Sequence, residues 1–462
     1  MTSFMRSAAS RRSTERPALA TLLLAAMLTL ATLTGGASFP DTLGQAVVRT
    51  GSMLLVAIAI GSTQRFDLRS YRNLGFILAA AILIVLLQLV PLPPALWRAL
   101  PGRAWFDIGA GVPAVADAWR PAAIVPDGAR NALFALIVPT CTLLLVATVP
   151  RRELKLVVPF LVAMVGLSSV LAAMQFAGST FDNPFINERL GFASGLLANR
   201  NHQALFLAIG IVAALHWATT RPLAPWRVAA GGITVLWFAL MILATGSRAG
   251  LMLGLVALLA GTVLGISVAR RAGLRLSRRM AFLVGVAGVL VCVGLVAASL
   301  YAGRSASLDR LNDAVIGDDM RIRALPVVLE MVRTYLPLGA GQGGFATLFA
   351  VVEPDRLLKP TYFNHAHDDF LELLIESGIP GALLLIAALA WFARRTWIVW
   401  RHTPDGDTLR GRLGSIIIAL VLLASFTDYP ARTPIIMVVL VVAAAWLTVP
   451  LSPALPDERS TL

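Results

Sequence analysis

Apolar runs long enough to cross a membrane recur along the whole chain. A bilayer core of about 30 Å requires roughly 20 apolar residues in a helix, and we count twelve segments that meet this requirement. Their approximate centres are residues 27, 54, 83, 140, 165, 210, 236, 259, 290, 388, 419 and 441. The pattern predicts an all-α polytopic membrane protein with about 12 transmembrane helices.

Polar residues interrupt this pattern for the longest stretch between residues 302 and 380. That stretch mixes charged residues, glycines and short amphipathic segments, which favours a small helical cap outside the membrane over a disordered linker. We therefore divide the chain into three parts. Residues 1–301 hold transmembrane helices 1–9 and short loops, residues 302–380 form a large loop, and residues 381–462 hold transmembrane helices 10–12 and a cytoplasmic tail.

Composition indicates that lipid is the solvent of this chain. Of its 462 residues, 57% are hydrophobic and 14% are charged, which is unlike a soluble domain. The net charge of +14 comes from short basic clusters between apolar runs, so it indicates topology and contact with anionic lipid heads, and it excludes nucleic acid as the expected partner. Cys141 and Cys292 lie inside apolar runs, and neither predicts a disulfide or a zinc site.

The basic clusters also predict an orientation. If the N-terminus is cytoplasmic, every cluster falls in a cytoplasmic loop, as the positive-inside rule requires. These clusters are Arg65/Arg69/Arg72, Arg151/Arg152/Lys155, Arg221/Arg227, Arg270/Arg271/Arg275/Arg278/Arg279 and Arg394/Arg395/Arg401/Arg410/Arg412. Both termini are then cytoplasmic. The outward segments are residues 94–130, residues 176–201, the turn at Arg248 and residues 302–380.

The richest polar cluster spans residues 364–381, with the sequence NHAHDDFLELLIESGIPG. Its spacing predicts a helix that places Asp368, Glu372 and Glu376 on one face. Gly378 is expected to end this helix immediately before the next membrane span.

His367 therefore lies at a predicted helix N-terminus near the bilayer surface. A histidine there can accept a proton from an attacking hydroxyl at neutral pH, because its unperturbed pKa is about 6.5. A cap-and-turn histidine without chemistry is the alternative interpretation. A metal site built from His365, His367, Asp368 and Asp369 is a third, which their crowding within five residues disfavours.

Two further polar motifs interrupt apolar helices. The turn 245–250 places Arg248 where a charge is costly in lipid, so Arg248 either extends to the lipid headgroups or binds an anion. The start of the sixth span carries Arg200, Asn201 and His202. Helix capping by Asn199 or Asn201 explains part of this polarity, and a substrate cleft lined by Arg200 and His202 would explain the rest.

The large loop contains Arg321 and Arg323, followed by a glycine-rich stretch over residues 339–344. The glycines match G-x-G-x-x-G literally. No strand precedes the stretch and no βαβ unit follows it, so a dinucleotide site is rejected. A flexible turn, or close backbone approach to a ligand, is the preferred interpretation.

Across residues 190 to 400 the sequence resembles the O-antigen ligase and O-antigen polymerase superfamily of bacterial membrane glycan transferases. Four elements occur in order: the Asn-Arg-Asn-His start of the sixth span, the Gly-Ser-Arg turn, the segment from Arg321 to its Pro-Leu-Gly-x-Gly core, and the histidine-led helix. The ligase pattern of histidine, small polar residue, nine residues and Gly-x-x-Gly matches His367, Asp368 and residues 378–381. Two positions depart from it. Asp368 replaces the usual amide or hydroxyl residue, and Leu325 replaces a tryptophan found in many relatives.

The resemblance implies a GT-C-like fold and a metal-independent, inverting transfer without a cofactor. A glycan would move from undecaprenyl pyrophosphate to an acceptor hydroxyl at the periplasmic face of the bacterial inner membrane. The acceptor would be the lipid A core in a ligase or a growing polysaccharide in a polymerase. A transporter or flippase is a third possibility, which the gathering of polar residues at one membrane face disfavours.

The resemblance also implies roles for individual residues. Arg248 and Arg321 would hold the pyrophosphate, and His367 would assist the acceptor hydroxyl. The remaining expected substrate-binding residues are Arg200, Asn201, His202, Arg323, His365 and Asp368.

Overall fold

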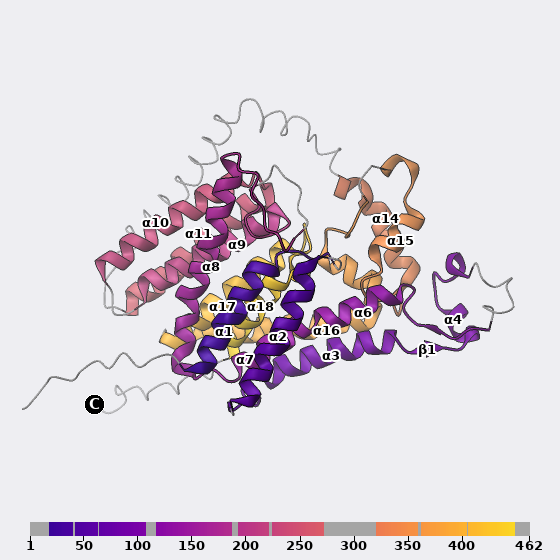
Figure 1. Ribbon diagram of the computed structural model, residues 1–462, viewed down its shortest axis with the longest axis horizontal. Coiled ribbons are helices and arrows are strands. Elements are labelled where there is room, and N and C mark those ends of the chain that lie inside the picture. The colour runs from indigo at the N-terminus through magenta and orange to yellow at the C-terminus, as the bar shows by residue number, and fades with distance from the viewer. Residues whose placement is uncertain are drawn as a thin grey trace, which may run out of the picture.

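The computed structural model describes residues 18–39, 42–62, 64–107, 117–186, 193–220, 224–271, 320–358, 362–403 and 405–448. Helices dominate these ranges (Figure 1). Two short strands, β1 (Pro91–Leu92) and β2 (Arg120–Pro121), pair antiparallel.

A helix lies at each predicted centre within the described residues, and the centre at residue 290 lies outside them. These helices are α1 (Leu19–Thr34), α2 (Leu43–Gly61), α3 (Arg72–Gln88), α7 (Ile137–Val146), α8 (Val157–Phe176), α9 (Arg200–Thr219), α10 (Pro225–Ala244), α11 (Arg248–Arg271), α16 (Asp369–Arg401), α17 (Gly406–Ala424) and α18 (Pro434–Thr448). The remaining helical elements are α4 (Pro94–Ala99), η1 (Ala104–Phe106), α6 (Pro126–Ala135), η3 (Arg151–Leu156), α14 (Met320–Tyr335), α15 (Phe345–Val352), η5 (Asp355–Leu357) and η6 (Pro430–Arg432).

Seven helical segments of the described residues are long and apolar enough to cross a bilayer, with α6 and α7 counted as one span. Three further apolar helices, α1, α3 and α18, are shorter. Helix α17 is 19 residues long and begins with charged residues that include Arg410 and Arg412. These findings confirm a helical multi-pass membrane protein, whereas the number twelve and the GT-C-like cap stay predictions.

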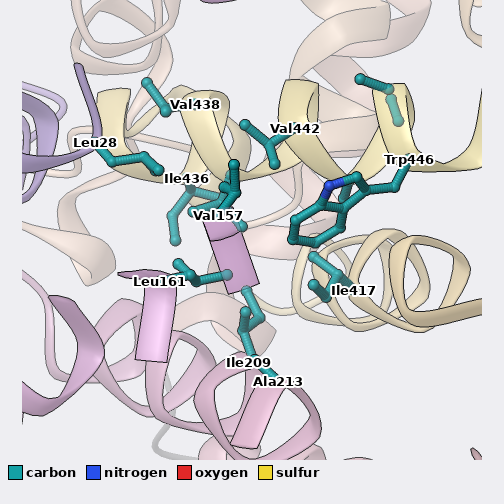
Figure 2. Close-up of a cluster of buried hydrophobic side chains, with 14 of the residues drawn as sticks. Leu28, Val157, Leu161, Ile209, Ala213, Ile417, Ile436, Val438, Val442 and Trp446 are labelled. Atoms are coloured by element: carbon teal, nitrogen blue, oxygen red, sulfur yellow. The ribbon is translucent and has the colours of Figure 1, made fainter. Parts of the chain in front are cut away.

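Helix α9 lies at the centre of the bundle, with 83% of its span buried. It packs against α8, α10, α11 and α17. Figure 2 shows how α1, α8, α9, α17 and α18 share one apolar core, in which Ile209, Ile417 and Trp446 meet. Dense packing of this kind fixes the relative positions of the helix ends that carry the polar residues.

A second, smaller apolar core joins α14, α15 and the start of α16. Tyr335, Phe345, Phe349 and Phe363 are buried in it. Helices α14 and α15 lie together at one end of the bundle (Figure 1). Residues 302–319 of the predicted large loop lie outside the described residues, so the three-part division of the chain stays a prediction.

Gly378 interrupts α16 as predicted, because its backbone has φ 52° and ψ −142°. A Cβ at this position would lie 2.2 Å from the carbonyl oxygen of Pro337. A Cβ at Gly339 would lie 2.5 Å from the carbonyl oxygen of Glu376. These glycines therefore allow two backbones to pass in contact, which supports the close-approach interpretation with protein backbone in place of a ligand.

Candidate functional site

Asp428, in the loop between α17 and α18, is the centre of a buried polar cluster. Its side chain is 4% exposed. The Nδ2 atoms of Asn201 and Asn199 donate to Oδ2 at 2.7 and 3.1 Å, and Nδ1 of His367 lies 3.1 Å from Oδ1. We refer to these residues, with His202 and Arg321, as the Asp428 cluster.

His202 and Arg321 complete this cluster. Nε2 of His202 lies 3.7 Å from Oδ1 of Asp428, and a guanidinium nitrogen of Arg321 lies 3.7 Å from Oδ2. Arg321 also donates to the carbonyl oxygen of Thr427 at 2.8 Å. Burial favours the neutral form of Asp428, but its contacts with His202 and His367 outweigh burial and hold the pKa of the carboxyl well below its usual range. One negative charge is thus surrounded by donors.

His367 adopts a backbone φ of 55°, and no other non-glycine residue among the described ones has a positive φ. Such a conformation is costly, and it recurs at functional sites where surrounding structure enforces it. The imidazole lies beside the rings of Phe363 and Tyr429, at centroid distances of 5.3 and 5.1 Å. Because an ionised Asp428 only accepts hydrogen bonds, Nδ1 of His367 must carry the proton. In the neutral imidazole Nε2 then carries the lone pair, and within the described residues it has no hydrogen-bond partner.

The Arg248 turn approaches the same cluster through its neighbour Ser247. The Ser247 hydroxyl donates to Oδ1 of Asn201 at 2.7 Å, and Asn201 in turn donates to Asp428. Arg248 itself is exposed at the first position of α11. The guanidinium of Arg200 also extends to this turn, since a Cβ at Gly246 would lie 3.8 Å from it.

A second polar cluster has the opposite charge pattern, with an arginine at its centre. Arg432 lies 3.0 Å from Glu376, 3.2 Å from Glu372 and 3.4 Å from Asp369. Burial alone would lower the pKa of Arg432, but the three carboxylates outweigh burial and raise it. His365 joins this Arg432 cluster, because its Nδ1 lies 2.8 Å from Glu372.

Tyr429 separates the two clusters. Its ring centroid lies 4.0 Å from that of His365, on the Arg432 side, and 5.1 Å from that of His367, on the Asp428 side. Its hydroxyl accepts from Asn364 at 3.1 Å. The two histidines of the predicted motif therefore serve different clusters, although only one residue lies between them.

The other predicted residues lie at different places. Asp368 caps α16 and accepts from the backbone of Phe370 and Leu371 at 2.9 and 3.0 Å. Arg323 donates to the carbonyl oxygen of Arg356 at 2.7 Å. Among the described residues no group of three or more His, Cys, Asp or Glu could hold a metal ion. The four side chains considered for a metal are directed to four different sets of partners.

A cavity of about 870 Å³ opens on the Arg432 side. His365, Asp369, Glu372, Glu376 and Arg432 line its polar end. From there it continues between α3, α16 and α18 along apolar side chains. The combination of a polar end and an apolar remainder suits an amphipathic molecule.

Sequence reasoning did not identify Asp428, Tyr429 or Arg432. The available signal was the polar run within residues 425–432, between two apolar runs, in a loop that the predicted topology places on the outward side. Glu372 and Glu376 were expected on one helix face, and both are fully buried against Arg432. Asn199 does cap α9, as the helix-capping interpretation expected.

The fold and these clusters define a class: a helical multi-pass membrane protein with two buried polar clusters at one end of its bundle. Residues 233–386 match the family model described as O-Antigen ligase. The match supports, over this region of the chain, the superfamily that the motifs indicated. The matched region includes Arg248, Arg321 and His367, whereas Asp428 and Arg432 lie beyond it. A comparison with curated proteins gave no match.

Proposed function

We propose that this protein is an O-antigen ligase-type glycosyltransferase. It transfers a glycan from undecaprenyl pyrophosphate to a hydroxyl of the lipid A core at the periplasmic face of the inner membrane. The main supporting observation is that Asn201, Arg321 and His367, from three separate motifs, meet at Asp428.

In the proposed reaction His367 is the general base. The acceptor hydroxyl oxygen attacks the anomeric carbon of the donor sugar, and its proton passes to Nε2 of His367. The bond between that carbon and the pyrophosphate oxygen breaks, and its electron pair leaves with the pyrophosphate. Asp428 holds the imidazole in the required tautomer and stabilises the imidazolium that forms.

Arg248 and Arg321 are proposed to bind the pyrophosphate leaving group. Guanidinium groups match phosphate oxygens in geometry and stay charged, so they neutralise the developing charge without a metal ion. Arg321 is positioned by the Thr427 carbonyl while its side chain keeps 32% exposure. Arg200, beside the Arg248 turn, is placed to add a third positive charge.

The proposed location follows from the distribution of charge along the chain. Basic clusters fall in alternate loops, which supports cytoplasmic termini and a periplasmic position for the Asp428 cluster. Lipid-linked glycans and their acceptors would enter that end from the bilayer, as the amphipathic cavity suggests.

A polysaccharide polymerase of the same superfamily is the second candidate. Asp368, at a position where the ligase pattern has an amide or hydroxyl residue, favours it. The donor, leaving group and base would be the same, and the acceptor would be a growing lipid-linked polysaccharide. A transporter or flippase would not require a base oriented by a buried carboxylate.

Glycan profiles of cells test this proposal. The profiles of wild-type, deletion and His367→Ala strains would resolve decorated lipopolysaccharide from free and lipid-linked polysaccharide. Loss of decorated lipopolysaccharide with long lipid-linked chains accumulating supports the ligase, and accumulation of single lipid-linked repeat units supports the polymerase. An unaltered profile in a stably expressed His367→Ala strain, with the deletion strain altered, would remove His367 from the chemistry.

A further inference from the structure

Arg49 is a cation in the membrane helix α2 without a counter-ion among the described residues. One guanidinium nitrogen donates to Oε1 of Gln45 at 2.9 Å and to Oδ1 of Asn131 at 2.8 Å. Both partners are neutral amides. The Nε of Arg49 is buried without a hydrogen-bond partner in the described part of the chain. An uncompensated charge at this depth is costly, and it indicates a ligand that supplies the missing negative charge.

This arginine lines the cavity of about 870 Å³ that ends at the Arg432 cluster. The apolar wall on α16 extends from Ser377 to Phe392, which corresponds to a length of roughly 22 Å at about 1.5 Å per residue. Such a length accommodates a long hydrocarbon chain lying along the helices. Arg49 therefore adds one unpaired positive charge to a cavity otherwise suited to lipid.

The depth of Arg49 follows from its neighbours on α2. Ser38 lies 3.5 Å from Nε2 of His365, at the polar end of the cavity. Gln45 donates to the carbonyl oxygen of Ala37 at 2.6 Å, which places it near that end. Arg49 follows Gln45 by one helical turn, so it lies farther into the bilayer than His365.

The Arg432 cluster cannot provide the same anion site. Its three carboxylates outnumber its one guanidinium, and each of them contacts that guanidinium. A phosphate beside Glu372 and Glu376 would be repelled, whereas sugar hydroxyls can donate to carboxylate oxygens. The charges of Arg49 and of the Arg432 cluster therefore favour phosphate at Arg49 and sugar at the polar end.

We propose that Arg49 binds the phosphate joined to the polyprenyl chain of the donor, with that chain lying in the cavity. This inference rests on the proposed function for the identity of the lipid. Arg49 then sets the depth of the donor in the bilayer, while Arg248 and Arg321 act on the phosphate that leaves the sugar. Arg49 is in this sense a binding residue separate from the Asp428 cluster.

Binding of two lipids to the purified full chain in lipid nanodiscs tests the proposal. Undecaprenyl phosphate has only the chain-linked phosphate, and undecaprenyl pyrophosphate has both. Arg49→Gln should weaken binding of both lipids by roughly tenfold or more, because a charge-assisted hydrogen bond is lost. Arg49→Lys should keep part of the affinity. Arg321→Gln should weaken only the binding of undecaprenyl pyrophosphate.

Three controls make the outcome decisive. Arg69→Gln removes an exposed charge in the turn between α2 and α3 and should leave both affinities unchanged. Ala81→Trp fills the cavity from α3 while keeping Arg49, and it should reduce binding of both lipids. Thermal unfolding of each variant shows whether the fold persists.

The outcomes separate the two proposals. Unchanged binding of both lipids by a folded Arg49→Gln variant would overturn the role of Arg49 and leave the proposed function standing. Failure of the wild-type chain to bind either lipid would overturn the proposed function itself. Equal loss of phosphatidylglycerol binding in Arg49→Gln would make the cavity a general site for anionic phospholipid, and it would overturn the polyprenyl assignment.

Discussion

The Asp428 and Arg432 clusters lie on either side of one tyrosine and have opposite charge patterns. In the first, a single carboxylate is surrounded by two amides, two imidazoles and a guanidinium. In the second, a single guanidinium is surrounded by three carboxylates, two of them fully buried. The first cluster has donors in excess of its one negative charge, and it suits an anionic ligand and proton transfer. The second has its cation in contact with all three carboxylates, and it suits a structural role and contact with sugar hydroxyls.

The comparison teaches that burial and ionic contacts alone do not distinguish the cluster proposed to carry the reaction. Both clusters contain a histidine next to a carboxylate. Only His367 combines a strained backbone with an Nε2 available for a ligand. His365 instead lies within a network in which Glu372 also accepts from the backbone of Ala366 at 2.8 Å.

The largest expected effect separates the two histidines. His367→Gln should lower the turnover of glycan transfer by roughly 100- to 10,000-fold, because a general base contributes about that much. His365→Gln should lower it far less. The measurement is single-turnover transfer by purified protein with a lipid-linked donor, with thermal unfolding as the control for folding. Equal losses in both variants would end the distinction between the clusters.

The next effect concerns stability. Arg432→Gln leaves three carboxylates, two of them fully buried, without their cation, so we expect the free energy of unfolding to fall by about 3–5 kcal/mol. Adding Glu372→Gln and Glu376→Gln to Arg432→Gln should recover part of that loss. Denaturant or thermal unfolding in detergent measures both. A folded Arg432→Gln variant of wild-type stability that has lost only turnover would place Arg432 in the chemistry instead.

A smaller effect is expected from a substitution that keeps the charge. Arg321→Lys retains a cation near Asp428 but loses the planar fork of donors, so transfer should fall by roughly tenfold. In Arg321→Gln the rate of transfer should fall by about 100-fold, which is the usual effect of removing one charge-stabilising contact. Steady-state kinetics with purified donor compares them. Arg323→Gln, which removes a contact with a backbone carbonyl, is the matched control.

The helical architecture was predictable because each span is an apolar run, and a run of that kind specifies a helix locally. The break at Gly378 was predictable for the same reason, since a glycine before a proline ends a helix. Which helix ends lie next to each other was not predictable from the sequence. Nothing local to Asn201 indicates that it will lie beside Asp428, which is 227 residues later.

The candidate site was predictable where its residues stood out from apolar surroundings. His367, Arg321 and Asn201 did so, and they meet at one carboxylate. Asp428 and Arg432 did not, because a short polar loop between two spans looks like an ordinary turn. Arg49 was likewise hidden, since it stands near the start of the apolar run centred at residue 54 and its isolation appears only when its neighbours are known.

The loop between α17 and α18 carries the centres of both clusters only four residues apart, with Tyr429 between the two histidines. This one loop therefore fixes the positions of two clusters whose central residues have opposite charge. A one-residue insertion between Asp428 and Arg432 would displace the Asp428 cluster and the Arg432 cluster relative to each other. Redesign of the proposed acceptor specificity should accordingly keep this loop unchanged. Substitutions should be made in α2, α3 or the glycine-rich segment before α15.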